Sequence, residues 1–278
     1  MKCADSMQPA ADKWEIPRYS EQQINDAGNV MRDGNSALKA RQDALQIVNN
    51  WRFSHAHPLK EITDSLIRDN KDATVERRLK RLESIVEKLK RFPDTRLYQM
   101  DDLGACRVIA DSVWDVYDAV IRYKDVCTAH VLVSEDDYIR YPKASGYRAY
   151  HMVYQYRGEK KGVCDDHMLI EIQFRTKLQH IWATAVETMG ICTKSKTKTG
   201  ENADAEVLRF FVLLSSVFAR MESVPICPGT PDHYEQLIDE IKEIDERLNI
   251  LSGLEARSVS ENYAGTAEFV KLMRKILA

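Results

Sequence analysis

The chain has 278 residues, of which 44% are hydrophobic, 8% aromatic and 30% charged, and its formal net charge is −3. This composition excludes a globally disordered chain, and the length predicts one large domain, or one domain with a smaller helical appendage. Because the net charge is small and negative, there is no global positive field for a polyanion, so any such site must be local.

The N-terminal part of the chain is rich in helix formers. Residues 20–50 carry apolar side chains roughly at helical spacing, which predicts one or two helices. Pro58 disfavours helix at the residue before it and commonly stands at a helix start. We therefore expect the block 51–59 to interrupt the helical pattern and a new helix to follow near residues 59–68.

The middle of the chain, residues 102–192, changes to strand-forming sequence. Short β-rich runs occur at residues 105–109, 128–133, 149–156 and 168–174, with one helical pattern at 113–123. Helical patterns return at residues 178–189, 205–221, 234–251 and 264–277. Strands in the middle and helices at both ends predict an α/β or α+β fold with a core sheet.

The helix predicted at residues 234–251 has a heptad-like pattern. Its apolar residues follow alternating steps of three and four over nearly three heptads: Tyr234, Leu237, Ile241, Ile244, Leu248 and Leu251. This pattern is typical either of an oligomer seam or of a helix that packs on its own domain. A homo-oligomer therefore stays an open alternative.

These changes along the chain predict four segments. We expect a flexible N-terminus at residues 1–20, a helical region at 21–72, a central domain at 73–225 and C-terminal helices at 231–278. No stretch has the length and apolar character of a signal peptide or membrane span, so a cytoplasmic protein with no membrane partner is expected. The six cysteines are scattered, which predicts neither disulfides nor a structural zinc site.

Residues 168–176 alternate strictly between apolar and polar side chains. One face of this predicted strand carries a carboxylate, an amide and a guanidinium, from Glu171, Gln173 and Arg175. Asp102 stands at the mouth of another predicted strand, where binding sites often form. Asp102 and Glu171 together suit Mg²⁺, which takes its other ligands from water and substrate phosphates. The alternatives are a solvent-facing strand and an aspartate in a turn.

Two further stretches suit a nucleotide. Residues 75–91 hold seven basic and three acidic residues, and since the chain has no glycine-rich phosphate motif, phosphate binding would fall to Arg and Lys side chains. Residues 137–151 combine tyrosines with cations, which suits base stacking beside phosphate binding. Taken alone, the first is typical of a solvated helix face and the second of a turn with exposed tyrosines.

In this order, the four stretches resemble the synthetase domain of the RelA/SpoT alarmone family. The family motifs R-x-K-x-x-x-S-I-x-x-K, D-x-x-G-x-R, D-Y-I-x-x-P-K-x-x-G-Y-x-x-x-H and E-I-Q-x-R-T correspond to residues 78–88, 102–107, 137–151 and 171–176. The resemblance covers roughly residues 75–190. It implies a mixed, roughly five-stranded sheet flanked by helices, of nucleotidyltransferase-like fold, and transfer of pyrophosphate from ATP to a ribose 3′-hydroxyl.

The resemblance also implies a role for each motif residue. Asp102 would be a Mg²⁺ ligand, and Glu171 would meet the metal and activate the attacking hydroxyl. The residues implied to face ATP are Arg78, Lys80, Ser84, Lys88 and Arg107. Tyr147 would stack on the acceptor base, and the acceptor's phosphates and ribose would be met by Lys143, Arg148, His151, Gln173 and Arg175.

Three positions depart from the family pattern. Ala105 stands where D-x-x-G-x-R has glycine, and Gly104 next to it is expected to supply the flexibility. Ser145 stands where alarmone-making members mostly have asparagine, and Thr188 where W-A-x-x-x-E-H has histidine. The departures resemble a branch that includes toxic members, some of which modify the tRNA 3′-CCA end. A lysine run at residues 194–198 would then contact tRNA, although such a run is also typical of a solvated loop.

Three functions follow from the resemblance. The leading one is ATP-dependent synthesis of (p)ppGpp-type alarmones of the stringent response from GDP or GTP. The second is pyrophosphorylation of the tRNA 3′ end by a toxin, which would need an antitoxin in trans because residues after 231 show no sign of a fused one. The third is a catalytically silent nucleotide or RNA-binding module, against which the presence of Asp102 and Glu171 counts.

Overall fold

The computed structural model describes residues 14–127, 129–158, 167–195, 201–260 and 264–277. The contacts divide the chain into two compact units. Unit 1 holds the residues up to Val108, Ile121–Glu135 and Met152–Gln173, and unit 2 holds Ile109–Val120, Asp136–His151 and the residues from Phe174 on. The boundary crosses the strands of one sheet, and so it differs from the four consecutive segments predicted from sequence.

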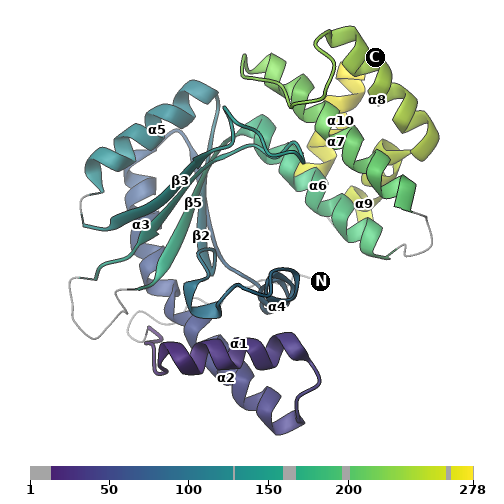
Figure 1. Ribbon diagram of the computed structural model, residues 1–278. Coiled ribbons are helices and arrows are strands. Elements are labelled where there is room, and N and C mark those ends of the chain that lie inside the picture. The colour runs from purple at the N-terminus through teal and green to yellow at the C-terminus, as the bar shows by residue number, and fades with distance from the viewer. Residues whose placement is uncertain (1–13, 128, 159–166, 196–200, 261–263, 278) are drawn as a thin grey trace. The chain divides into compact units, whose positions relative to one another are not determined.

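Unit 1 begins with three helices, α1 (Glu21–Asp33), α2 (Leu38–Ser54) and α3 (Ala56–Asp69). The Ser20 and Gln23 side chains form a capping box at the start of α1. Gly34 ends α1 with φ +71°, a left-handed conformation that glycine adopts at little cost. Helix α1 packs on α2, as Figure 1 shows in purple. The helices predicted within residues 20–50 are confirmed.

The predicted break at residues 51–59 is shorter than expected. Helix α2 continues to Ser54, because Trp51 is fully buried and stacks on Tyr98 with ring centroids 4.9 Å apart. Burial of this large ring favours continued helix over the local composition. Pro58 lies in the first turn of α3, as predicted.

The segment before α1 is bound to α2 from residue 14 on. The Asn50 Nδ2 atom donates to the Ile16 carbonyl at 2.9 Å, and Asn50 Oδ1 accepts from the Arg18 backbone N–H at 3.1 Å. The prediction of a flexible N-terminus is therefore wrong for residues 14–20, and residues 1–13 lie outside the described part of the chain.

The core is a five-stranded sheet with the order β1-β2-β5-β4-β3. Its strands are β1 (Thr74–Leu79), β2 (Gly104–Ala110), β3 (Val131–Asp137), β4 (Tyr150–Gln155) and β5 (Leu169–Thr176). Four of them confirm the predicted runs. Strand β1 corrects the interpretation of residues 75–91 as one basic helix face, since only the second half is helical, as α4 (Leu82–Arg91). A short 3₁₀ helix, η1 (Leu97–Gln99), leads to β2.

One face of the sheet is buried under helices. Ile170, Ile172 and Phe174 of β5 are fully buried, as the alternation predicted. In unit 1, Tyr123 of α5 (Val113–Val126) packs edge-on against Tyr154 of β4.

Gly104 of β2 allows close packing between the sheet and α3. A Cβ atom there would lie 2.8 Å from Ile170 Cδ1 and 3.3 Å from His55 Cβ, so glycine lets α3 approach β2 closely. Its φ lies outside the left-handed region, so the close contact with α3 is what requires glycine at this position.

Unit 2 contains the C-terminal helices, drawn green to yellow in Figure 1. They are α6 (Lys177–Ser195), α7 (Glu201–Met221), α8 (Tyr234–Leu248), α9 (Ile250–Ser260) and α10 (Ala264–Leu277). Their apolar side chains form one core, which includes Trp182, Phe210, Leu214, Phe218, Leu237 and Phe269. Among the described residues, no helix has both the length and the hydropathy needed to span a membrane.

The heptad-like segment packs within unit 2. The helix predicted at 234–251 is split at Asn249, which caps α8 in the left-handed conformation with φ +51°. Leu237, Ile241 and Ile244 are buried in the core of unit 2, which confirms the intramolecular alternative and leaves these side chains unavailable for an oligomer seam. Of the predicted lysine loop, Lys194 and Ser195 belong to α6, and residues 196–198 lie outside the described part.

Candidate active site

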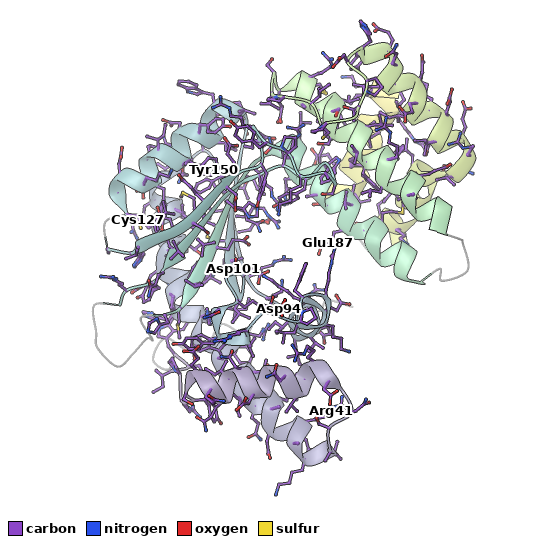
Figure 2. All side chains as sticks on the ribbon, viewed as in Figure 1. Arg41, Asp94, Asp101, Cys127, Tyr150 and Glu187 are labelled. Atoms are coloured by element: carbon purple, nitrogen blue, oxygen red, sulfur yellow. The ribbon has the colours of Figure 1, made fainter. Side chains whose placement is uncertain are left out.

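In unit 1, the Asp102 carboxylate forms ion pairs with two lysines. Lys80 Nζ lies 2.6 Å from Asp102 Oδ2, and Lys88 Nζ lies 3.0 Å from Asp102 Oδ1 and 3.0 Å from Asp101 Oδ1. Lys80 directly follows β1, where its backbone N–H donates to the Leu103 carbonyl, and Asp101 lies in the turn before β2 (Figure 2). Strand pairing thus brings the first two motifs together.

The charges around Lys88 stabilise its ammonium form. Burial by itself lowers the pKa of Lys88, but the charges and hydrogen bonds of Asp102 and Asp101 outweigh this and raise the pKa above its ordinary value. Ser84 lies one turn before Lys88 on the same face of α4. Two predicted ATP-facing residues therefore share this helix face.

The polar face of strands β1, β2 and β5 holds a small pocket within unit 1. Its lining includes Arg78, Arg107 and Gln173. Gln173 Nε2 donates to Glu171 Oε2 at 2.7 Å, so the predicted catalytic carboxylate lies beside this pocket. Arg107 Nη1 is 3.5 Å from Glu76 Oε2. The structure thus places Gln173 with the predicted ATP-facing arginines, although the resemblance implied acceptor binding for it.

Asp102 and Glu171 carry carboxylate oxygens, which are hard ligands of the kind that Mg²⁺ prefers. In this structure both Asp102 oxygens pair with Lys80 and Lys88, and Glu171 Oε2 accepts from Gln173. No group of three or more metal-ligating side chains occurs among the residues that the structure describes. A magnesium ion held by these two residues would therefore take its remaining ligands from water and substrate phosphates, as is usual for this ion in phosphoryl-transfer sites.

Unit 2 presents an aromatic and cationic cluster around Tyr147. The Tyr147 hydroxyl lies 2.6 Å from His151 Nε2 and also accepts a hydrogen bond from Arg175 Nη2. The Arg175 guanidinium lies over the Tyr147 ring at 4.9 Å from its centroid. Lys143 Nζ is 4.1 Å from the ring centroid of Tyr138 and 5.5 Å from that of Tyr147. Four predicted acceptor residues are thus brought together.

Tyr147 also lines an apolar pocket in unit 2. Trp182 and Phe211 are among the other lining residues, and Ser145 contributes a hydroxyl. The Trp182 Nε1–H donates to the Phe211 carbonyl at 2.9 Å. The pocket is therefore apolar beside the ring of Tyr147, while the hydroxyl of Tyr147 contacts His151 and Arg175.

Arg148 departs from its predicted role as an acceptor contact. Its side chain is buried, and the residue is only 3% exposed. The guanidinium donates to the Ile139 carbonyl at 2.9 Å, the Pro225 carbonyl at 2.7 Å and Ser215 Oγ at 2.9 Å. Burial lowers the pKa of Arg148 below its ordinary value. The motif places Arg148 directly after Tyr147 but does not show that its side chain points into the interior.

Sequence reasoning missed Tyr138, Asp101 and Ser215. Tyr138 lies inside the motif at residues 137–151 and Asp101 directly precedes the one at 102–107, so their aromatic and acidic character was available as a signal. Ser215 lies on α7, outside every motif, and no sequence signal marks it. Thr188, one of the departures, bonds to Thr266 of α10 with their hydroxyl oxygens 2.9 Å apart, so this position joins two helices of unit 2.

Comparisons with known proteins agree with this geometry. Residues 77–200 match the family model described as "Region found in RelA / SpoT proteins". The GTP pyrophosphokinase YjbM of Bacillus subtilis (strain 168) is 35% identical over an alignment of 117 residues, and the match covers 38% of this chain and 51% of the relative. The chain thus matches about half the length of that relative.

Two solved structures show the same fold. The crystal structure of small alarmone synthetase 1 from Bacillus subtilis is 26% identical, with a TM-score of 0.50 over 61% of this chain and 89% of that chain. The same synthetase bound to its product pppGpp is 25% identical, with a TM-score of 0.51 over 61% of this chain and 90% of that one. Residues 77–200 are thus similar to the RelA/SpoT family, and the fold of the chain is similar to that of small alarmone synthetases.

Proposed function

We propose that this protein is a magnesium-dependent pyrophosphokinase that transfers pyrophosphate from ATP to the ribose 3′-hydroxyl of GDP or GTP, giving (p)ppGpp. The observation that carries the proposal is the pocket of Arg78 and Arg107 beside Gln173, whose amide holds the Glu171 carboxylate. The two arginines can bind the phosphates of ATP, and the carboxylate can accept the proton of the attacking hydroxyl. The match to a curated GTP pyrophosphokinase supports the same class of acceptor.

The cations of unit 1 suit the donor nucleotide. Lys80 and Lys88 lie on Asp102, and Arg78 and Arg107 line the neighbouring pocket. Guanidinium groups bind phosphate oxygens in bidentate geometry, and lysines act as point charges on them. Asp102 and Glu171 would hold Mg²⁺, which when bound neutralises the charge of the polyphosphate.

Glu171 has the chemistry of a general base. The acceptor's 3′-oxygen attacks the β-phosphorus of ATP, the bond from this phosphorus to the α–β bridging oxygen breaks, and AMP leaves. A ribose hydroxyl is a weak nucleophile near neutral pH, so a carboxylate within hydrogen-bond reach must accept its proton as the new bond forms. The hydrogen bond from Gln173, at 2.7 Å, orients the Glu171 carboxylate for this role.

Unit 2 suits the acceptor. A purine base has a π-face for stacking on Tyr147, and Lys143, His151 and Arg175 surround this ring with cationic or hydrogen-bonding groups. Strand β5 carries Glu171 and Gln173 of unit 1 and Arg175 of unit 2 at alternate positions. The relative bound to pppGpp supports a guanosine nucleotide with a 3′ pyrophosphate as the product.

The test is a transfer assay with ATP labelled at the γ-phosphate and Mg²⁺. GDP, GTP, ATP and deacylated tRNA are offered separately as acceptors, and the Glu171→Ala variant is the blank. We expect label on GDP or GTP with the wild type and none with the variant. Omission of Mg²⁺, with EDTA present, is expected to abolish the transfer as well.

Two other outcomes would overturn the proposal in different ways. Label on tRNA alone would replace the guanosine acceptor with the tRNA 3′ end. In that case binding would weaken steeply with salt, because a polyanion releases many counterions. Absence of transfer to any acceptor, in a protein that ATP still protects against thermal unfolding, would favour a silent nucleotide-binding module.

A further inference from the structure

We infer that Arg148 and Ser215 are positioning residues that fix the stacking Tyr147 from below the surface, and so set the affinity for the acceptor. The inference rests on the proposed function, because it assigns a base to Tyr147. Neither residue touches the acceptor side of the ring: Arg148 is 3% exposed and Ser215 is 2% exposed. Both act through the backbone on the two sides of Tyr147.

Arg148 ties the loop to two other segments of unit 2. Its Nη1 atom donates to the carbonyl of Ile139, which follows β3. Its Nη2 atom donates to the carbonyl of Pro225, which follows α7, and lies 3.5 Å from Cys227 Sγ. A planar guanidinium has five donors in a fixed geometry, so several simultaneous bonds define the orientation of the residue that carries it.

Ser215 connects Arg148 with the residue before Tyr147. Its hydroxyl accepts from Arg148 Nε at 2.9 Å and donates to the Gly146 carbonyl at 2.6 Å. Helix α7 therefore holds residues 146 and 148 through one side chain, and Tyr147 lies between them.

The shape of the loop confirms how closely it lies on α7. Gly146 has φ +85°, and a Cβ atom there would lie 3.0 Å from Ser215 Cβ and 3.2 Å from Val212 Cα. Two backbone bonds close the turn, from Gly146 N–H to the Lys143 carbonyl at 2.8 Å and from Lys143 N–H to the Tyr147 carbonyl at 3.2 Å. With no side chain at 146, the loop lies directly on the helix.

The chemistry of the anchor favours positioning over stability. Every hydrogen-bond oxygen on the Arg148 guanidinium comes from a neutral group: two carbonyls and a hydroxyl. The Glu222 carboxylate stabilises the Arg148 charge through space, while burial of that charge is costly, and apolar residues of similar volume often stabilise a fold as well or better. What the buried guanidinium provides here is one defined orientation for the loop that presents Tyr147.

The test compares two neighbouring serines of α7. Ser215→Ala removes the link between Arg148 and Gly146. Ser216→Ala is the matched control, because Ser216 is equally buried but its hydroxyl bonds to the Cys227 backbone N–H and to Thr230, whereas that of Ser215 bonds to Arg148, Gly146 and the Cys227 thiol. We expect Ser215→Ala to raise KM for the guanosine acceptor about 10-fold, the equivalent of one well-placed hydrogen bond, with KM for ATP unchanged. Ser216→Ala is expected to change neither.

A second measurement needs no substrate. With 3-fluorotyrosine in place of Tyr147, the ¹⁹F resonance reports the surroundings of the ring. We expect Ser215→Ala to shift or broaden this resonance and Ser216→Ala to leave it unchanged. If Ser215→Ala does not fold, Arg148→Lys takes its place, since lysine keeps the charge but loses the planar set of donors.

Equal effects of the two serine variants, or no effect of either, would overturn the inference, because Ser215 would then act only as a core residue. The proposed function fails separately, if the wild type does not transfer label to a guanosine nucleotide. The ¹⁹F comparison still decides in that case whether Arg148 and Ser215 position Tyr147.

Discussion

The two candidate binding regions of this protein are held in different ways. In unit 1, Asp102 lies between Lys80 and Lys88, and these partly exposed side chains hold each other by charge. In unit 2, Tyr147 is presented by a loop whose backbone is fixed by the buried Arg148 and by Ser215. The first region relies on ion pairs between side chains, and the second on hydrogen bonds to backbone carbonyls.

The difference corresponds to the two kinds of ligand proposed. Phosphates carry charge, so lysines already near a carboxylate can bind them by exchanging one anion for another. A base is recognised by the position of a flat ring, which requires a rigid support. Under the proposed function, the region around Asp102 would adapt when ATP binds, whereas the loop that presents Tyr147 would need to be preorganised.

The largest effect is expected from loss of the proposed general base, which belongs to neither the ion pairs of unit 1 nor the hydrogen-bonded loop of unit 2. Glu171→Gln removes the proton acceptor but keeps an oxygen that can accept the bond from Gln173. We expect the rate of pyrophosphate transfer to fall about 10²- to 10⁴-fold, with the thermal unfolding midpoint unchanged. Glu135→Gln, which breaks the ion pair with Lys124 elsewhere in unit 1, is the control. Equal rates in the two variants would remove Glu171 from the catalytic role.

The next effect tests the rigid loop. Gly146→Ala should lower the free energy of unfolding by about 1–3 kcal/mol and raise KM for the acceptor, because the position is left-handed and crowded by Ser215 and Val212. Gly229→Ala is a matched control with φ +75° and nothing within 4 Å of its Cβ position. Urea unfolding measures the free energy of unfolding of each variant, and acceptor kinetics measure its KM. Equal losses for the two variants would show that crowding against α7 contributes nothing.

A change in the ion pairs around Asp102 should alter KM for ATP and not KM for the acceptor. Lys80→Met removes one of the two cations on Asp102, and we expect KM for ATP to rise about 10-fold while KM for the acceptor stays constant. Lys60→Met serves as control, since Lys60 pairs with Asp64 along α3. A rise in the acceptor's KM instead would contradict the assignment of unit 1 to ATP.

The smallest effect is a pH dependence. Aspartates 101 and 102 raise the pKa of Lys88, so the folded protein keeps this proton to higher pH than the unfolded chain does. The resulting stabilisation is fully present below the ordinary lysine pKa of about 10.4 and is lost as pH rises through the raised value. We expect the difference in unfolding free energy between the wild type and Lys88→Met to be constant from neutral pH up to that point and to shrink above it.

Urea unfolding at a series of pH values measures this difference. Lys90→Met, at an exposed position of α4, controls for the loss of a positive charge from the same helix. A difference between the wild type and Lys88→Met that grows with pH would contradict the assigned sign.

Local patterns predicted much of the fold and of the charged region. The alternation of β5 set its buried and polar faces, and four strands and most helices follow from periodicity, because such patterns depend only on neighbouring residues. The motifs also identified Asp102, Lys80 and Lys88, which the pairing of β1 with β2 brings into contact. Strand β1 was not predicted, because its charged residues are as typical of a solvated helix face as of a strand. Its pairing with β2 is a long-range contact that local composition does not show.

What the sequence determined by itself is the set of chemical groups and their order: the carboxylates, the cations and the stacking tyrosine. Only the tertiary structure decided which of them turn inward. The local sequence around Arg148 would be the same if its side chain bound a phosphate instead of three neutral oxygens of its own fold. Likewise, Leu237 would occupy the same heptad position if it faced a partner chain instead of its own core. Burial depends on segments far apart in the chain, such as Pro225 and Ser215 beside Arg148, and no local spacing encodes it.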